Sequence, residues 1–214
     1  MTTTDTGVPV RDLGKCSYGE ALRVQEDLHA RRAADEIDNT LILVEHEPVY
    51  TLGRSAERSH VVFSPEQLQR TGISVVSSDR GGDVTYHGPG QLVGYPIVRL
   101  ERRLMGVLRY VETLEKVLIN VLSDFGVTGT RKKVNRGVWV GEEKLAAIGI
   151  RVKKHVTMHG FCLNVTTNLD HYSGIIPCGL SGWGVTSLNL LVPGVEMAEV
   201  KQSVIRRFSE EFAS

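Results

Sequence analysis

RGGDVTYHGPGQ, residues 80–91, is the segment that decides how the chain is organised. Four glycines stand in it beside Arg80, Tyr86 and His87. Backbone without side chains can approach a ligand closely, and large polar side chains cost desolvation free energy if they are buried without partners. These residue types fit a ligand-binding loop and a glycine-rich hairpin between two strands equally well. Other segments must distinguish the two.

The glycines do not follow a nucleotide-binding pattern. Gly88, Gly90 and Gly94 miss the dinucleotide-binding spacing by one residue, and no Gly-Lys-Ser/Thr follows to form a phosphate-binding loop. We therefore expect no nucleotide at this segment.

Hydrophobic periodicity predicts alternating strands and helices around residues 80–91. Pro96 indicates an edge position or a bulge for the strand that follows them. A Ser17–Glu20 capping box begins the first helix, and Ser64 caps a short one with Pro65 at its first position. The predicted helices are 17–37, a short one from 64, 104–125 and 197–212, and the predicted strands are 40–46, 49–53, 73–78, 92–100, 137–140, 144–152 and 159–165.

Length and composition indicate one domain, residues 1–214, without a general affinity for polyanions. The chain is 41% hydrophobic, and 25 Lys and Arg balance 25 Asp and Glu. A neutral protein has no overall field that would attract nucleic acid or an acidic membrane surface, so we expect neither as a partner. The N-terminal sequence lacks the features of a signal peptide, and no segment is apolar enough to span a bilayer. We expect a cytoplasmic protein.

Three cysteines, Cys16, Cys162 and Cys178, are an odd number without CxxC spacing. This argues against a disulfide framework and a structural zinc site. His155 and His159 are four residues apart but flank a predicted turn between strands rather than lie on a helix face, so we expect no metal.

Cys178 and Lys144 are the candidates for covalent chemistry. A thiolate attacks acyl groups far better than a thiol, and a cysteine with a pKa of ~8.5 needs a nearby cation or base to ionise at neutral pH. Lys144 follows a tight turn and begins the small-residue strand LAAIGI. Taken singly, a buried thiol and a solvated turn lysine are the more ordinary interpretations. Their combination with residues 80–91 favours catalysis.

Three segments together resemble the lipoyl(octanoyl) transferase family. They are RGGDVTYHGPGQLVGYPI at 80–97, KLAAIGIRV at 144–152 followed by HGFCLNV at 159–165, and PCG at 177–179 followed by VTSL at 185–188. The resemblance covers the chain from the first helix onward. It implies one α/β (α+β) domain of the biotin and lipoate protein ligase type, with a mixed sheet flanked by helices.

The resemblance also implies an activity and its participants. The enzyme would move an octanoyl or lipoyl group from acyl carrier protein to a lysine of a lipoyl domain or of glycine-cleavage H protein, through a thioester and without a cofactor. Cys178 would be the nucleophile, and Lys144 would lower its pKa and transfer protons. The implied acyl-substrate site comprises Arg80, Gly81, Gly82, Asp83, Val84, Thr85, Tyr86, His87, Ala147, Ile148, Gly149, Gly160, Phe161 and Cys162.

Cys162 departs from the family pattern, which commonly has a small apolar residue there. We expect it to be a buried hydrophobic residue, although a second thiol facing the pocket fits as well. Two other functions remain open. An ATP-dependent lipoate or biotin ligase would need no nucleophilic cysteine, so the PCG segment argues against it. A non-catalytic lipoyl-domain or carrier-binding protein would not need both Lys144 and Cys178.

Overall fold

The computed structural model describes residues 7–100, 106–133, 135–176 and 184–213. Within them, eight strands form a mixed sheet in the order β1-β2-β6-β10-β9-β8-β7, with β11 beside β9, and three more form a small sheet in the order β4-β3-β5. The strands are β1 Val10–Cys16, β2 Thr40–His46, β3 Val49–Leu52, β4 Ser74–Ser77, β5 Val84–His87, β6 Gln91–Ile97, β7 Thr130–Lys132, β8 Asn135–Val140, β9 Glu143–Lys153, β10 Val156–Asn164 and β11 Gly184–Val185. The helices are α1 Tyr18–Ala33, α2 Pro65–Thr71, α3 Val107–Asp124, α4 Leu188–Leu191 and α5 Met197–Phe212, with 3₁₀ helices at Arg58–His60 and Leu169–Gly174.

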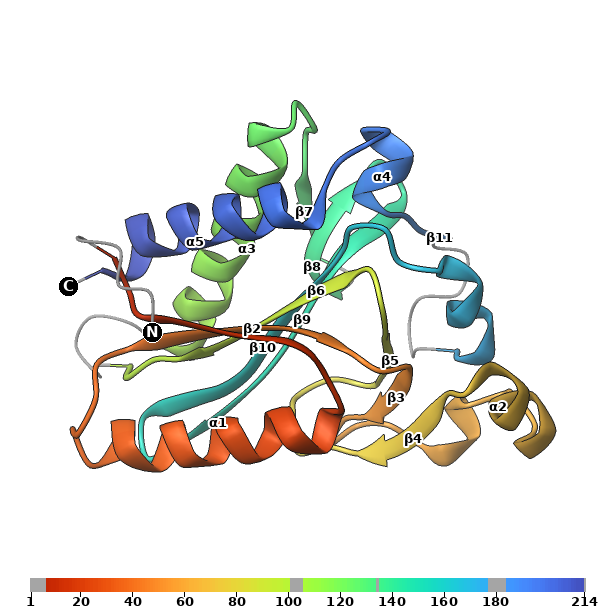
Figure 1. Cartoon of the computed structure of the whole chain (residues 1–214), viewed down its shortest axis with the longest axis horizontal. Coiled ribbons are helices and arrows are strands. Elements are labelled where there is room, and N and C mark those ends of the chain that lie inside the picture. The colour runs from red at the N-terminus through yellow and green to blue at the C-terminus, as the bar shows by residue number, and fades with distance from the viewer. Residues whose placement is uncertain (1–6, 101–105, 134, 177–183, 214) are drawn as a thin grey trace.

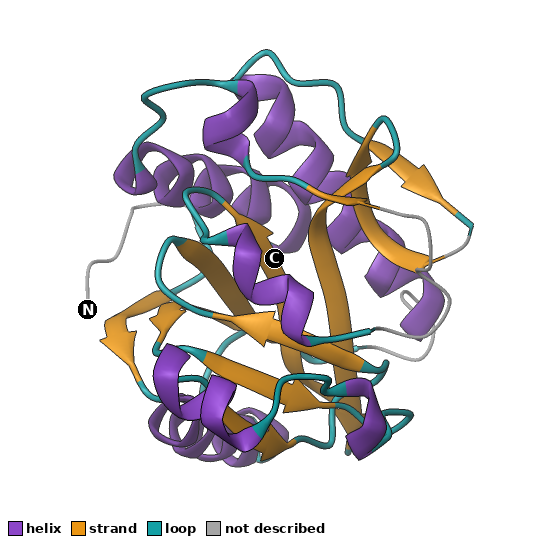
Figure 2. Cartoon of the chain, turned by 90° about the vertical axis from the view of Figure 1, so that its right-hand side faces the viewer, coloured by secondary structure: helices purple, strands orange, loops and turns teal. Residues whose placement is uncertain are grey.

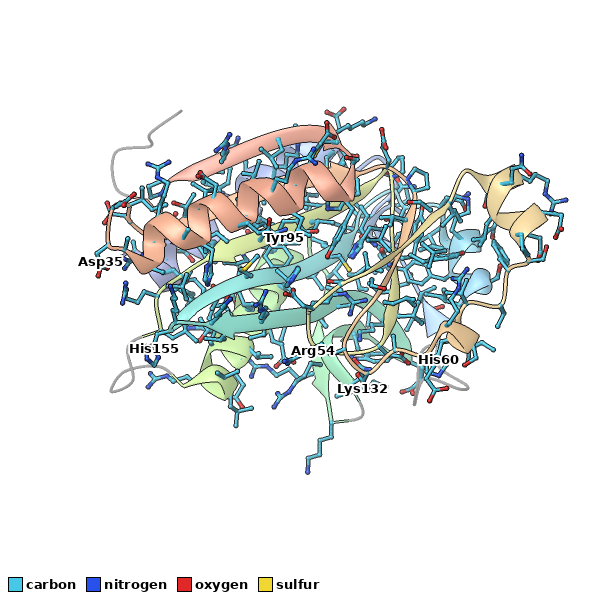
Figure 3. All side chains as sticks on the ribbon, turned by 90° about the horizontal axis from the view of Figure 1, so that it is seen from below. Asp35, Arg54, His60, Tyr95, Lys132 and His155 are labelled. Atoms are coloured by element: carbon cyan, nitrogen blue, oxygen red, sulfur yellow. The ribbon has the colours of Figure 1, made fainter. Side chains whose placement is uncertain are left out.

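Helices cover both faces of the large sheet (Figure 1). On one face α3 and α5 pack together, and their apolar side chains join those of β9 and β10 in the largest core cluster. On the other face α1 lies across β2, β6 and β10, and Figure 3 shows it from below with Tyr95 beside it. None of the described helices is long and apolar enough to cross a membrane.

The predicted helix starts at Ser17 and Ser64 and the predicted C-terminal glycine at Gly126 are confirmed, whereas the first helix ends at Ala33 and not at residue 37 as predicted. The Ser17 hydroxyl accepts the Glu20 N–H at 3.3 Å while the Ser17 N–H donates to the Glu20 carboxylate at 3.0 Å, which satisfies two N-terminal groups of α1. Ser64 and Gln67 form the same reciprocal pair at α2. After α3, Gly126 has φ +73°, the left-handed conformation that glycine adopts at a helix C-terminus.

The segment 80–91 is more ordered than a loop. Its middle forms β5, which pairs antiparallel with β3 in the small sheet, with Thr85 opposite Thr51. Figure 2 looks onto this side of the molecule. The expectation of a loop between two strands was therefore incomplete: residues 84–87 alternate apolar and polar groups, and β3 offers them a free edge.

Pro96 lies in an interior strand, so the predicted edge position is wrong. The alternative of a bulge is wrong as well, because Gly94 opposite Phe161 and Arg99 opposite Val156 belong to one uninterrupted register. β6 pairs with β2 on one side and β10 on the other. In the register that pairs Phe161 with Gly94, Pro96 lies opposite His159, which has φ +55°. The His159 N–H donates to Gln25 of α1 at 2.9 Å, and the Pro96 carbonyl accepts the Thr157 hydroxyl at 2.6 Å. Side chains thus replace the ladder bonds that proline interrupts.

Candidate active site

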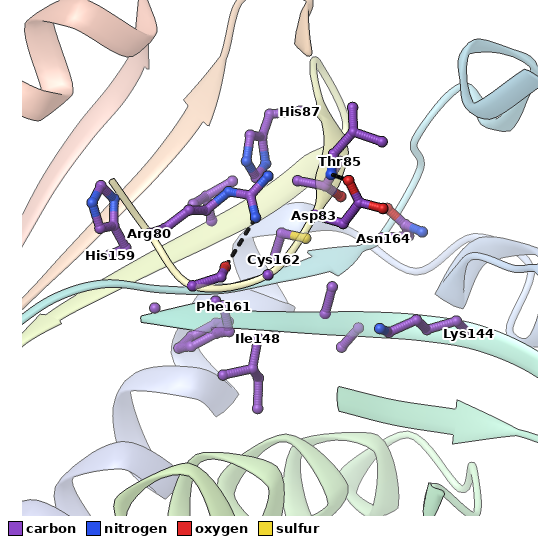
Figure 4. A pocket seen from close by; sticks show the side chains of 18 of the residues that line it. Arg80, Asp83, Thr85, His87, Lys144, Ile148, His159, Phe161, Cys162 and Asn164 are labelled. Carbon is purple, nitrogen blue, oxygen red and sulfur yellow. Dashed lines mark hydrogen bonds between the residues drawn. The ribbon is translucent and has the colours of Figure 1, made fainter. Parts of the chain in front are cut away.

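A cavity of about 120 Å³ lies where residues 80–87 pass over β9 and β10 (Figure 4). The Gly81 N–H donates to the Ile150 carbonyl at 2.8 Å and holds the segment against the sheet. Because Gly149 has no side chain, Arg80 can lie over it; a Cβ there would stand 2.8 Å from the Gly81 oxygen. The residues predicted from the sequence that line the cavity are Arg80, Gly81, Gly82, Asp83, Val84, Thr85, His87, Lys144, Ala147, Ile148, Gly149, Gly160, Phe161 and Cys162.

Of the predicted site residues that the structure describes, Tyr86 does not line the cavity. It is fully buried in the small sheet's own core, where its ring packs edge-on against Tyr50 and Tyr172. Its hydroxyl is 2.7 Å from His171 Nδ1. Successive side chains of a strand point to opposite faces, so Tyr86 lies on the face opposite Thr85 and His87. Val84 shares the face and core cluster of Tyr86 but lines the cavity from the start of β5.

Cys178 lies outside the described residues. The chain before it is fixed at Ile176, whose N–H donates to the His60 carbonyl at 2.9 Å. The chain after it is fixed at β11, where Val185 pairs in parallel register with Lys144.

Lys144 is a buried cation at the start of β9. Its side chain passes over Gly137, where a Cβ would stand 2.9 Å from the lysine Cε. Its Nζ donates to Asn135 Oδ1 at 2.6 Å and lies 5.4 Å from the centroid of the Trp139 ring. Burial lowers the pKa of Lys144 from its ordinary 10.5 to about 8; negative charge on Cys162, when it is ionised, and on Glu115 opposes this shift, and the charge of Arg80 adds to it. Such an amine can exchange a proton near neutral pH.

Arg80 is the second buried cation, and it is held entirely by neutral groups. Its guanidinium donates to the Thr51 carbonyl at 2.6 Å, to the Thr51 hydroxyl at 2.9 and 3.1 Å, and to the Gly81 carbonyl at 3.1 Å. Within the described residues no carboxylate forms an ion pair with it. Burial lowers the pKa of Arg80, yet a guanidinium remains charged at any physiological pH. The cavity therefore contains a permanent positive charge.

His87 is neutral and presents an acceptor nitrogen. Gln91 Nε2 donates to Asn164 Oδ1 at 2.9 Å, which orients the amide so that its oxygen faces His87 Nδ1 at 2.8 Å. Burial holds the pKa of His87 well below 6.5, with further lowering by His46. Nδ1 therefore carries the only ring proton and Nε2 is an acceptor.

Cys162 is a buried thiol on the cavity wall, 4% exposed, packed in the core cluster with Val93 and Tyr95. Burial raises the pKa of the Cys162 thiol. It is thus both the buried small residue and the cavity-facing thiol that the sequence suggested, and it remains protonated at neutral pH.

Several cavity residues were missed in the sequence. Asn135 precedes the GVWV strand and Tyr18 begins α1, and neither belongs to a recognisable motif. His159, considered only as a metal ligand, lines the cavity and places its Nε2 2.7 Å from Asp79 Oδ1. Within the described residues no group of three His, Cys, Asp or Glu side chains is placed to hold a metal ion.

Comparison with known proteins gives the family. Residues 17–209 match the model of the lipoyl protein ligase A/B catalytic domain. An octanoyltransferase of Alkaliphilus metalliredigens is 50% identical over 205 residues, which are 95% of this chain and 94% of that protein. One of Syntrophobacter fumaroxidans is 47% identical over 203 residues, 93% and 89% of the two chains. The protein belongs to the octanoyltransferases of this family. The resemblance of the three sequence segments is confirmed, and with it the prediction of an acyltransferase.

Solved structures confirm the predicted fold. The bi-partite lipoate protein ligase of Thermoplasma acidophilum superposes with a TM-score of 0.74 at 18% identity, over 96% of this chain and 84% of that one. A biotin protein ligase of Aquifex aeolicus gives 0.56 at 14% identity, over 96% and 68%. This chain therefore shares the mixed sheet and flanking helices of these lipoate and biotin protein ligases.

Proposed function

We propose that the protein transfers an octanoyl group from acyl carrier protein to a lysine of a lipoyl domain or of glycine-cleavage H protein, through a thioester on Cys178. The observation that carries the proposal is the cavity that joins Lys144 to an acyl-sized space in an octanoyltransferase. Burial of about six methylenes at ~0.8 kcal/mol each would contribute roughly 5 kcal/mol to binding the acyl chain, an upper bound.

The position of the chain around Cys178 supports the pairing with Lys144. Cys178 is two residues from Ile176 and six from Gly184. An extended chain covers at most about 7 Å over two residues and about 20 Å over six, a reach that would allow Cys178 to meet Lys144 beside β11.

In the first step, the Cys178 thiol loses its proton to the neutral Lys144 amine and its sulfur attacks the thioester carbonyl. The new C–S bond forms, the bond to the carrier's thiol breaks, and the departing thiolate takes the proton. In the second step, the neutral amine of the acceptor lysine attacks the Cys178 thioester. The amide C–N bond forms, the C–S bond breaks, and the amine's proton reaches the Cys178 sulfur by way of Lys144.

Charge and hydrogen bonding in the cavity fit these steps. An amine of pKa about 8 is poised both to accept and to return a proton near neutral pH. The Arg80 charge stabilises the thiolate and the negative oxygen of the tetrahedral intermediate electrostatically. Thioester exchange followed by amide formation is downhill, so the route uses no ATP and no cofactor.

Intact-mass analysis tests the route. After incubation with octanoyl acyl carrier protein, the wild-type enzyme should gain one octanoyl group, Cys178→Ser should gain none, and the matched control Cys16→Ser should behave as wild type. The isolated acyl-enzyme should then acylate a lipoyl domain in buffer without nucleotide. Transfer that requires ATP would establish a ligase, and tight binding without any adduct would establish a binding protein.

Steady-state kinetics give an independent check of the covalent intermediate. Because the carrier leaves before the acceptor reacts, initial rates should follow a ping-pong pattern with the two protein substrates. Intersecting lines in the double-reciprocal plot would contradict a thioester on the enzyme.

A further inference from the structure

Asn135, at the start of β8, is the one hydrogen-bond partner of the Lys144 ammonium among the described residues, at 2.6 Å. Asn135 also lines the cavity, and its backbone carbonyl accepts the Trp139 indole N–H at 3.4 Å. The lysine head is thus fixed from two sides, by an amide oxygen and by the face of the Trp139 ring. Both groups recognise an ammonium without carrying charge.

In the part of the chain that the structure describes, the charged groups near Lys144 supply no counter-charge at contact distance. Glu115 of α3 is buried, but its carboxylate already pairs with Arg131 at 3.1 Å and Arg136 at 3.6 Å. Its other oxygen accepts the Gly137 N–H at 3.1 Å.

The other described neighbours of Lys144 supply no counter-charge in contact with its ammonium either. Cys162 on β10 is a protonated thiol, and Arg80 across the cavity is a cation. Lys132 lies on the Trp139 ring at 5.5 Å and pairs with Glu142. Among the described residues, the hydrogen bond that Lys144 Nζ donates to Asn135 Oδ1 is therefore the direct polar contact that determines where the ammonium lies.

We propose that Asn135 is the positioning residue of Lys144: its amide oxygen fixes the Nζ at the cavity, and its neutrality leaves the lysine free to give up a proton. The inference rests on the proposed function of Lys144 in acyl transfer. Aspartate has the same shape as asparagine, so a single charge separates the observed arrangement from a permanent ion pair. A carboxylate in direct contact would hold the lysine in its charged form.

Asn135→Asp tests this directly. The carbon-13 resonance of the Lys144 Cε, assigned by its loss in Lys144→Met, should titrate with a midpoint about one to three pH units higher than in wild type. The matched control is Asn39→Asp, at the far side of the sheet. The Asn39 Oδ1 accepts the Arg32 Nε–H at 2.9 Å and the Arg99 N–H at 3.0 Å, and an aspartate oxygen can accept both. The control should leave the Lys144 midpoint unchanged.

Activity gives the second readout. Asn135→Asp should lower the transfer rate about tenfold or more near pH 7, and the loss should shrink as the pH rises through the new midpoint. Asn135→Ala, which removes the acceptor without adding charge, should lower kcat with little change in KM and without an upward shift of the midpoint. Circular dichroism should show that both variants are folded.

The outcomes separate this inference from the proposed function. An unchanged Lys144 midpoint in Asn135→Asp, or an activity loss equal at every pH, would overturn the positioning role. Absence of acyl transfer in wild type would overturn the proposed function, while a shifted midpoint in the same preparation would still support the positioning role.

Discussion

Arg80 and Lys144 are both buried cations on one cavity, but they are bound differently. Counted over the described residues, Arg80 makes four hydrogen bonds to oxygens of Thr51 and Gly81, whereas Lys144 makes one to Asn135. Arg80 lies on the segment that crosses the sheet, and Lys144 lies on the sheet itself beside β11. The two side chains therefore place two kinds of positive charge in the same space.

The difference in anchoring corresponds to a difference in chemistry. A guanidinium bound by several oxygens cannot release its proton and acts only through its charge. A lysine whose burial has brought its pKa to about 8 can do so near neutral pH. One cation is suited to stabilise negative charge, and the other is suited to move protons.

Replacing Lys144, which can release a proton, by a residue that cannot should have the largest effect on the transfer rate. Lys144→Arg keeps the charge but removes proton transfer, and Lys144→Met removes both. Each should lower the single-turnover transfer rate by roughly 10²- to 10⁴-fold, the range of general acid–base catalysis. Recovery of more than a tenth of the activity in Lys144→Arg would show that charge alone is needed and that the contrast with Arg80 is false.

The pH dependence of stability sharpens the comparison. The Lys144 pKa is lowered on folding, so between pH 8 and 10.5 the unfolded chain binds more protons there than the folded one, and stability rises with pH. Below pH 8 both states are charged and the full cost of burial remains. Only wild type gains this stability, because methionine does not titrate. The unfolding free energy of Lys144→Met minus that of wild type should therefore fall by about 3 kcal/mol between pH 8 and 10.5. Urea denaturation at several pH values measures it, and a pH-independent difference would contradict the shifted pKa.

Weakening the anchor of Arg80 should have a smaller effect. Thr51→Val preserves the side-chain shape but removes the hydroxyl that accepts two of the four Arg80 bonds. We expect a loss of about 1–2 kcal/mol in unfolding free energy and less than a tenfold change in rate, with the same pH profile. Thr113→Val, on the exposed side of α3, is the control and should stay within about 0.5 kcal/mol. An altered pH profile in Thr51→Val would show that Arg80 and Lys144 act as one unit.

An exposed cation provides the weakest test. Acyl carrier proteins are expected to be acidic, so docking should use a local basic patch at residues 131–133. Arg131 pairs with buried Glu115, and Lys132 (labelled in Figure 3) pairs with Glu142, so reversing either also disturbs the fold. Exposed Lys133 is the better probe. Lys133→Glu should raise the carrier KM a few-fold at low salt and little at high salt, whereas Lys15→Glu on β1, at the opposite edge of the sheet, should not. Equal KM values at low salt would exclude the patch.

The features that could be predicted from the sequence are those that depend on residues close together in the chain. The capping pairs at Ser17 and Ser64 and the apolar stripe of α3 depend on residues three or four apart, and all three helices were found. The strands β1 and β7 were missed, because a seven-residue strand with exposed positions and a three-residue strand have little periodicity of their own.

The site was predictable only as far as the family resemblance reached. That resemblance named Arg80 and Lys144, and the structure brings both to one cavity. It gave no indication of Asn135 or Thr51, because each acts through contacts set by the pairing of strands. Tyr86 was included because the resemblance implied every residue from Arg80 to His87 as a substrate contact, whereas residue 86 lies in a strand, in which successive side chains point to opposite faces. The role of Cys178 stays a prediction.

The interruption at Pro96 has a consequence for how the molecule opens. The His159 amide, in the middle of the large sheet, is protected by Gln25 of α1 rather than by a neighbouring strand. Its hydrogen exchange should therefore follow the detachment of α1, while the Phe161 and Leu163 amides of the same strand exchange only when the sheet itself separates. A single strand thus belongs to two cooperative units, and the boundary between them passes through a residue that lines the cavity.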